Sequence, residues 1–173
     1  MGITDDIIDE HFEVAVEFMD NAQKLHIVDT ILERASELAG DITDSVMAEF
    51  YRGDPEAKDL FTHHCPVDTI RLEAGMVEQA LYCFMRWFQS PGEIRILLLG
   101  SVPHHVETLK VPVNYYHRFL QAMATVIRKT IPAESREEID VWNEICGDLG
   151  EIVDAANQYV NRAERIGKEA VHH

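Results

Sequence analysis

Apolar residues recur at intervals of three and four positions along most of the chain. This spacing predicts helices, because it gathers apolar side chains on one face of an α-helix. Runs of alternating apolar and polar residues, which would indicate strands, are absent from the sequence. The predicted helices cover, in order, residues 4–21, 26–38, 41–52, 56–61, 67–88, 93–99, 112–131 and 136 to near the C-terminus.

Glycine and proline mark the ends of several of these helices. Gly53-Asp54-Pro55 ends the third helix, because both residue types interrupt helical geometry. Residues 93–99 are apolar on nearly all sides, so they are expected to form a deeply buried helix or, as a second interpretation, a strand. Gly100 and Pro103 are expected to break this segment.

The length and composition favour one globular domain. The chain has 173 residues, of which 46% are hydrophobic, and this is enough to bury a substantial core. No linker rich in proline and serine divides it, so a leading helix over residues 1–25 and a helical domain over residues 26–173 are expected to form one unit. No membrane span is expected, because the sequence has no continuous apolar run of sufficient length. No secretory signal is expected either, because the chain starts with acidic rather than basic residues.

The net charge and the cysteines indicate which kinds of partner and which cellular compartment are expected. The net charge of −16 disfavours binding to nucleic acid and to anionic membranes, which would repel such a surface. Cys65, Cys83 and Cys146 are far apart and form no CxxC motif, which favours free thiols in a reducing cytoplasm. No phosphate loop, Glu-x-x-His repeat or pair of nucleophile and base is evident, so no enzymatic activity is expected.

One histidine segment carries the candidate chemistry. Pro112 follows His105 by seven positions and Tyr115 follows it by ten, and the proline stands where a long helix is predicted to begin. Taken alone, His105 has two interpretations: a metal ligand that faces an apolar pocket, or a surface histidine in a loop. The group His63-His64-Cys65 would have to join His104 and His105 to hold a transition metal, and its spacing matches no standard zinc pattern.

Taken together, these residues resemble the bacterial globins over about residues 26–160. The features that follow in the globin order are an aromatic-rich helix over residues 46–52, Pro55-Glu56, Leu60-Phe61, the His105 segment and Trp142 in the last helix. Ile70-Arg71-Leu72 and the helix before residue 26 are similar to the branch that contains globin-coupled sensors and protoglobins.

The resemblance implies an all-α, globin-like fold with an additional N-terminal helix, and haem b as the cofactor. It implies that His105 is the proximal iron ligand, with His104 as the alternative, and that Phe61 packs on the haem. The other residues expected at the haem site are Met47, Leu72, Met76, Tyr115 and Trp142. Met47 stands where the family often has a distal tyrosine, and a methionine donates no hydrogen bond to bound oxygen.

The function that the resemblance implies is reversible coordination of a diatomic gas (O2, CO or NO) in sensing or ligand binding. A homodimer through the last two helices is also expected. The alternative is a haem-less globin-fold domain for signalling or protein interaction, with an apolar ligand such as a fatty acid in its pocket. Met47 favours this alternative, as does Lys110, which stands where the family usually has an apolar residue.

Overall fold

The computed structural model describes residues 19–171, apart from the side chains of residues 64 and 163–171, and this part of the chain is all helical. Its elements are α2 (Asn21–Ala39), α3 (Thr43–Gly53), α4 (Pro55–His64), α5 (Thr69–Arg86), α6 (Pro91–Pro103), the π-helix η1 (His104–Thr108), α7 (Val113–Arg128) and α8 (Arg136–Val171). The all-α prediction is confirmed. Most of the expected leading helix, predicted over residues 4–21, falls on residues 1–18, which lie outside the described residues; Asn21 already belongs to α2.

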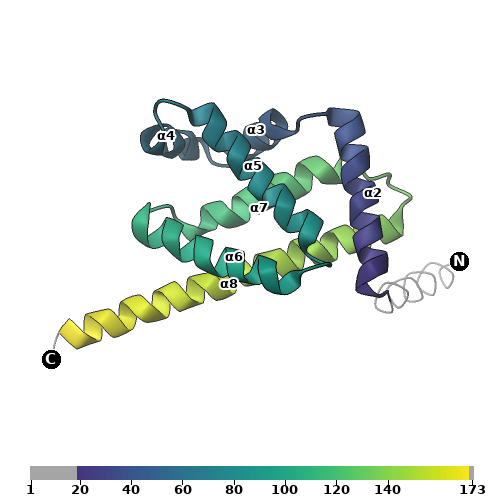
Figure 1. Cartoon of the computed structure of the whole chain (residues 1–173). Helices are drawn as coiled ribbons and strands as arrows, with labels where there is room; N and C mark the ends of the chain where they lie inside the picture. Colours follow the sequence, from purple (N-terminus) through teal and green to yellow (C-terminus); the bar gives the residue numbers. More distant parts are fainter. Residues whose placement is uncertain (1–18, 172–173) are drawn as a thin grey trace, which may run out of the picture.

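The helices pack in crossing layers (Figure 1). Helix α8 lies along α6 and also contacts α7, while α3 packs on α7. Helix α5 crosses α7, and α2 closes the opposite end of the molecule by packing on both α5 and α8. Helix α4, the C-terminal end of α6 and the start of α7 lie at the end of the bundle that is furthest from α2.

The core is formed by the apolar stripes that the sequence pattern predicts. Helix α8 contributes a row of buried side chains: Val141, Trp142, Ile145, Leu149, Ile152 and Val153. Trp142 stacks on Phe84 with ring centroids 4.9 Å apart, and its Nε1 donates a hydrogen bond to the carbonyl of Ala124 at 3.2 Å. Burial of each such large side chain stabilises the fold by about 1.5–3 kcal/mol, so this stripe fixes α8 against α5 and α7.

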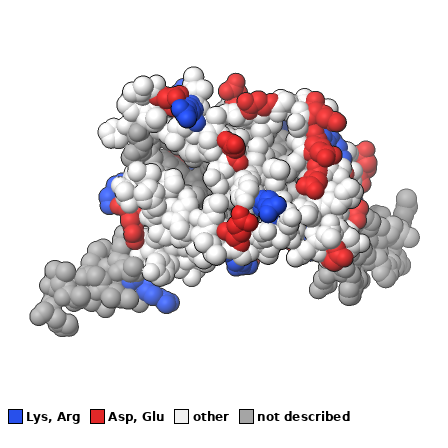
Figure 2. Space-filling model, viewed as in Figure 1, with Lys and Arg blue, Asp and Glu red and all other residues white. Residues whose placement is uncertain are grey.

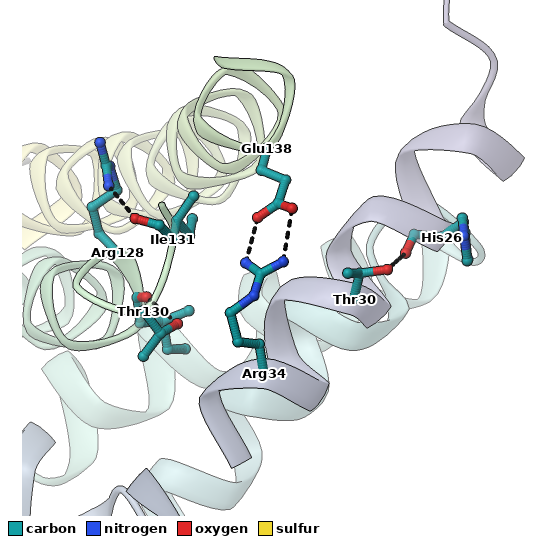
Figure 3. Close-up of polar contacts among 8 residues, drawn as sticks. His26, Thr30, Arg34, Arg128, Thr130, Ile131 and Glu138 are labelled. Carbon is teal, nitrogen blue, oxygen red and sulfur yellow. Dashed lines mark hydrogen bonds and ion pairs between the residues drawn. The ribbon is translucent and has the colours of Figure 1, made fainter. Parts of the chain in front are cut away.

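Charged groups on α2 reinforce its contact with α8. Both terminal nitrogens of Arg34 bind the carboxylate of Glu138, with the Nη2–Oε1 distance at 2.8 Å (Figure 3). Lys24 Nζ lies 2.6 Å from Glu144 Oε1. A two-pronged guanidinium–carboxylate contact fixes direction as well as distance, so it sets the angle of α2 on α8.

Some helix boundaries differ from the prediction because caps override the apolar pattern. Helix α2 begins at Asn21 rather than near His26, since Asp20 and Gln23 form a capping box there. Helix α4 continues to His64, three residues beyond its expected end. Helix α7 ends at Arg128, whereas its apolar pattern predicted helix to residue 131.

The expectations for residues 93–99 were wrong in two respects. The helix does not break at Gly100 but runs on to Pro103 and then into η1, because one glycine costs a helix only about 1 kcal/mol. Nor is the segment buried on all sides, since Ile96 is 76% exposed and Leu99 is 45% exposed. One face of α6 packs on α8 and the other is exposed to solvent. The apolar character of the segment alone did not show which residues lie on the exposed face. Within residues 19–171, no helix is both long and apolar enough to cross a membrane.

Candidate functional site

A cavity of about 410 Å³ lies between α3, α4, α5, α6, η1 and α7. Its wall is mainly apolar and includes Phe50, Leu60, Phe61, Leu72, Met76, Ala80, Leu97, Leu98, Leu109, Val111, Phe119 and Leu120. The volume is in the range of pockets that hold cofactors and small molecules. Figure 2 shows the surface hollowed between α5 and α6, with few charged side chains around the hollow.

A second, more open hollow of about 680 Å³ adjoins the cavity, and we refer to it as the mouth. It shares several wall residues with the cavity, among them Leu72, Met76 and His105. It adds the polar residues Asp68 and Arg71. A molecule in the cavity would therefore keep its apolar part inside and meet charged groups only at the mouth.

The backbone around His105 is irregular. Pro103 has no N–H to donate, so the hydrogen-bonding pattern of α6 is interrupted there, and the chain continues as a π-helix in which the Leu109 N–H lies 3.4 Å from the His104 carbonyl. Lys110 then reverses the chain with a φ of 57°. Single π-helical turns occur often at functional sites, and here the turn carries His105 on the cavity wall.

The His105 ring is held through its Nδ1 atom. This nitrogen lies 2.9 Å from the main-chain carbonyl of Ser101 and 2.7 Å from the hydroxyl of Tyr116. A carbonyl oxygen only accepts hydrogen bonds, so Nδ1 carries the proton. In the neutral imidazole this tautomer leaves a lone pair on Nε2, for which no hydrogen-bond partner is found among the described residues.

This arrangement makes His105 a ready ligand for a metal. A neutral imidazole with one nitrogen hydrogen-bonded and the other free is the usual form of a metal-binding histidine. The cluster of His63, Cys65, His104 and His105 is not assembled, because no group of three or more potential metal ligands occurs among the described residues. One histidine is sufficient for iron in a porphyrin, because the porphyrin itself supplies four nitrogen ligands.

Five of the residues singled out from the sequence meet at the cavity. His105, Phe61, Leu72, Met76 and Tyr115 all line it, although they come from different helices. Phe61 also packs edge-on against Phe50 with ring centroids 6.0 Å apart. The sequence spacing could not show this convergence, because it depends on how α4, α5 and α7 cross.

Three other candidates lie elsewhere. Met47 is 4% exposed in the core but is not part of the cavity wall, and Trp142 packs on Phe84. His104 is exposed and does not line the cavity, although its ring lies 5.8 Å from that of His105. Of the two adjacent histidines, only His105 therefore lines the cavity. The side chain of His64 lies outside the described residues.

The structure adds wall residues that the sequence reasoning missed. Gln79 and Cys83 follow Leu72 and Met76 at helical spacing on α5, so that spacing was the signal that could have revealed them. Burial raises the pKa of the Cys83 thiol to about 11, so the sulfur stays protonated at neutral pH and is a poor metal ligand. Tyr116 of α7 also lines the cavity, and its hydroxyl contacts His105.

A buried carboxylate holds α4 in place beside the cavity. Asp54, at the junction of α3 and α4, is 8% exposed and pairs with Arg118 of α7. Burial, followed by the nearby charge of Asp54, raises the pKa of Tyr115. The pair ties the start of α4 to α7, and α4 in turn carries Phe61 to the cavity.

A scan of protein-family models, a search of curated proteins and a search of solved structures each find no match to this chain. The function must therefore be argued from the cavity and from His105.

Proposed function

We propose that this chain binds haem b in the cavity through Nε2 of His105 and coordinates a diatomic gas, O2, CO or NO, on the opposite face of the iron. The observation that carries the proposal is the hydrogen bonding and the position of the His105 ring. Its Nδ1–H is bound to the Ser101 carbonyl, and its ring lies on the wall of an apolar cavity. The haem, when bound, would supply the iron and its open coordination position.

The residues of the cavity fit this group. Aromatic and aliphatic side chains such as Phe61 and Leu72 suit the flat, apolar faces of a porphyrin. The two haem carboxylates would need a polar outlet, and Arg71 lies at the mouth without an ion pair among the described residues. Gln79 is the amide on the wall, and its NH2 group is a candidate donor to a bound gas.

We also assign the helical arrangement to a globin-like fold. Support comes from the order of elements: α6 leads into the His105 segment, a proline follows at Pro112, and the long helices α7 and α8 complete the chain. Further support comes from the helices that line the cavity, since α5, α6 and α7 all contribute residues to its wall.

Absorption spectroscopy with a matched pair of histidine variants tests the haem proposal. The purified protein is incubated with haemin, reduced and exposed to carbon monoxide. A near-ultraviolet haem band that shifts with carbon monoxide is expected in the parent and in His104→Ala, because His104 does not line the cavity. The band should be lost or strongly weakened in His105→Ala. Equal spectra for both variants, or free haemin with the parent, would refute the assignment.

A second candidate function rests on the combination of an apolar cavity and Arg71 at its mouth. The same lining suits a fatty acid, with its alkyl chain inside and its carboxylate on the guanidinium, in a haem-less domain for signalling or protein interaction. Titration with a fluorescent fatty acid separates the two. Fatty-acid binding that weakens in Arg71→Ala and persists in His105→Ala, in a parent protein that binds no haem, supports the second candidate; the haem proposal instead expects haem binding that is lost in His105→Ala.

A further inference from the structure

The hydroxyl of Tyr116 reaches His105 from a different helix. Tyr116 lies on α7, and its oxygen is 2.7 Å from His105 Nδ1 and 2.8 Å from Ser101 Oγ. The two rings are perpendicular, with centroids 5.3 Å apart. Tyr116 is half-buried, beside an apolar cluster that includes Val102 and Val153. Packing of α7 on α8 therefore fixes where this hydroxyl stands.

The three shortest hydrogen bonds of this group can be assigned donors and acceptors; a fourth contact, between Ser101 Oγ and His105 Nδ1, is longer at 3.5 Å. The Ser101 carbonyl and the Tyr116 oxygen both accept from the single Nδ1–H, since a lone pair on Nδ1 would repel the carbonyl. The Tyr116 hydroxyl then has its own proton free to donate, and Ser101 Oγ is positioned to accept it. Ser101 thus holds the imidazole through its carbonyl and orients the phenol through its hydroxyl.

The two acceptors on Nδ1 differ in kind. The Ser101 carbonyl belongs to α6 and lies one turn before His105, so this hydrogen bond depends only on local helical structure. The Tyr116 hydroxyl belongs to α7 and depends on tertiary packing. An acceptor on the Nδ1–H draws the proton away from the ring, and this makes Nε2 a stronger donor to a metal.

From these observations we infer that Tyr116 is a positioning residue for His105: by accepting a hydrogen bond from Nδ1–H, it strengthens the bond that Nε2 makes to iron, and Ser101 Oγ orients it for that role. The effect on iron rests on the proposed function. The effect on the imidazole tautomer does not, because it is a property of the protein without cofactor.

The first test is nitrogen NMR of the His105 ring in the cofactor-free protein. The parent should show a protonated Nδ1 and a bare Nε2. Tyr116→Phe should keep this tautomer, held by the carbonyl, but with an Nδ1 resonance shifted by loss of one acceptor. Ser101→Ala frees the phenol to donate to Nδ1 instead, so the Nε2–H tautomer should increase. The double variant should return to the pattern of Tyr116→Phe.

The second test uses the haem-loaded, reduced protein. In Tyr116→Phe we expect a lower iron–histidine stretching frequency by resonance Raman spectroscopy and roughly tenfold faster loss of haem to a competing apo-globin. Tyr159→Phe is the matched control, because Tyr159 on α8 is 68% exposed and does not line the cavity. Thermal unfolding by circular dichroism checks that every variant is folded.

The outcomes separate the two claims. Identical NMR and Raman signals for Tyr116→Phe and Tyr159→Phe would overturn the role of Tyr116. If the parent protein binds no haem, the proposed function fails, and the NMR cycle still decides whether Tyr116 and Ser101 fix the His105 tautomer. An Nε2–H tautomer in the parent protein would overturn the hydrogen-bond assignment itself.

Discussion

At the scale of residues, two adjacent histidines have different environments. His104 is exposed, whereas the neighbouring His105 contacts Ser101 and Tyr116 and lines the cavity. The spacing to Pro112 and Tyr115 favoured His105 in the sequence, and of the two histidines only His105 lines the cavity. Burial also separates the cysteines, since Cys83 is 2% exposed while Cys65 is partly exposed.

The buried Cys83 thiol predicts a loss of stability at alkaline pH. Burial raises its pKa to about 11 in the folded protein, while the thiol in the unfolded chain ionises near ~8.5. Because the folded pKa is the higher one, its contribution is fully present below about pH 8.5 and falls as pH rises towards 11. The free energy of urea unfolding should drop across this window by roughly 2–3 kcal/mol on account of Cys83 alone.

The matched variant for this prediction is Cys83→Val, which keeps an apolar side chain of similar size and removes the titrating group. Urea unfolding at about pH 8 and about pH 10.5, under reducing conditions, should show a smaller fall for the variant than for the parent. Parallel pH profiles would mean that the thiol does not respond to burial as described.

At the scale of elements, the joint between α6 and α7 is the irregular part of the fold. The π-helix η1 follows Pro103, and Lys110 ends it in the left-handed region with a φ of 57°. A side chain with a Cβ is disfavoured in this region, where glycine is not. Helical periodicity predicts neither the π-turn nor this strain, because both arise from fitting the His105 segment between two packed helices.

Replacement of Lys110 by glycine should therefore stabilise the protein. The expected gain is about 0.5–1 kcal/mol, since relief of the left-handed conformation outweighs the greater freedom of glycine in the unfolded chain. Lys110→Ala is the control: it also removes the bond from Nζ to the Glu107 carbonyl but retains the Cβ. Chemical denaturation should rank the glycine variant above the alanine variant, and the reverse order would contradict the strain at this position.

At the scale of the whole molecule, charge is unevenly distributed. Acidic side chains gather over α2, which carries Asp29, Glu33 and Glu37, whereas few charges surround the hollow between α5 and α6 (Figure 2). The net charge of −16 means that carboxylates repel one another across the folded surface. Ion pairs such as Arg34–Glu138 offset this repulsion only locally.

Added salt should consequently stabilise the fold. Raising sodium chloride from about 0.01 M to about 0.15 M shortens the screening length from about 30 Å to about 8 Å. The midpoint of thermal unfolding should rise by about 2–4 °C, the shift that about 1 kcal/mol produces in a chain of this size. Sucrose at equal osmolality is the control for general solute effects. A midpoint that falls with salt would show that the ion pairs, rather than the repulsion, dominate.

The sequence by itself determined the all-α class, most of the helices and the residues His105, Phe61, Leu72 and Met76, which the structure brings to one cavity. The helical class follows from local periodicity, which every helix carries in its own residues, whereas these site residues were expected from the resemblance to the globins. Only the tertiary structure decided that Met47 and Trp142 lie outside the cavity wall, and that Tyr116 holds His105. The reason is physical: such contacts join residues of different helices, so they depend on crossing angles and caps that the apolar pattern of one helix does not contain.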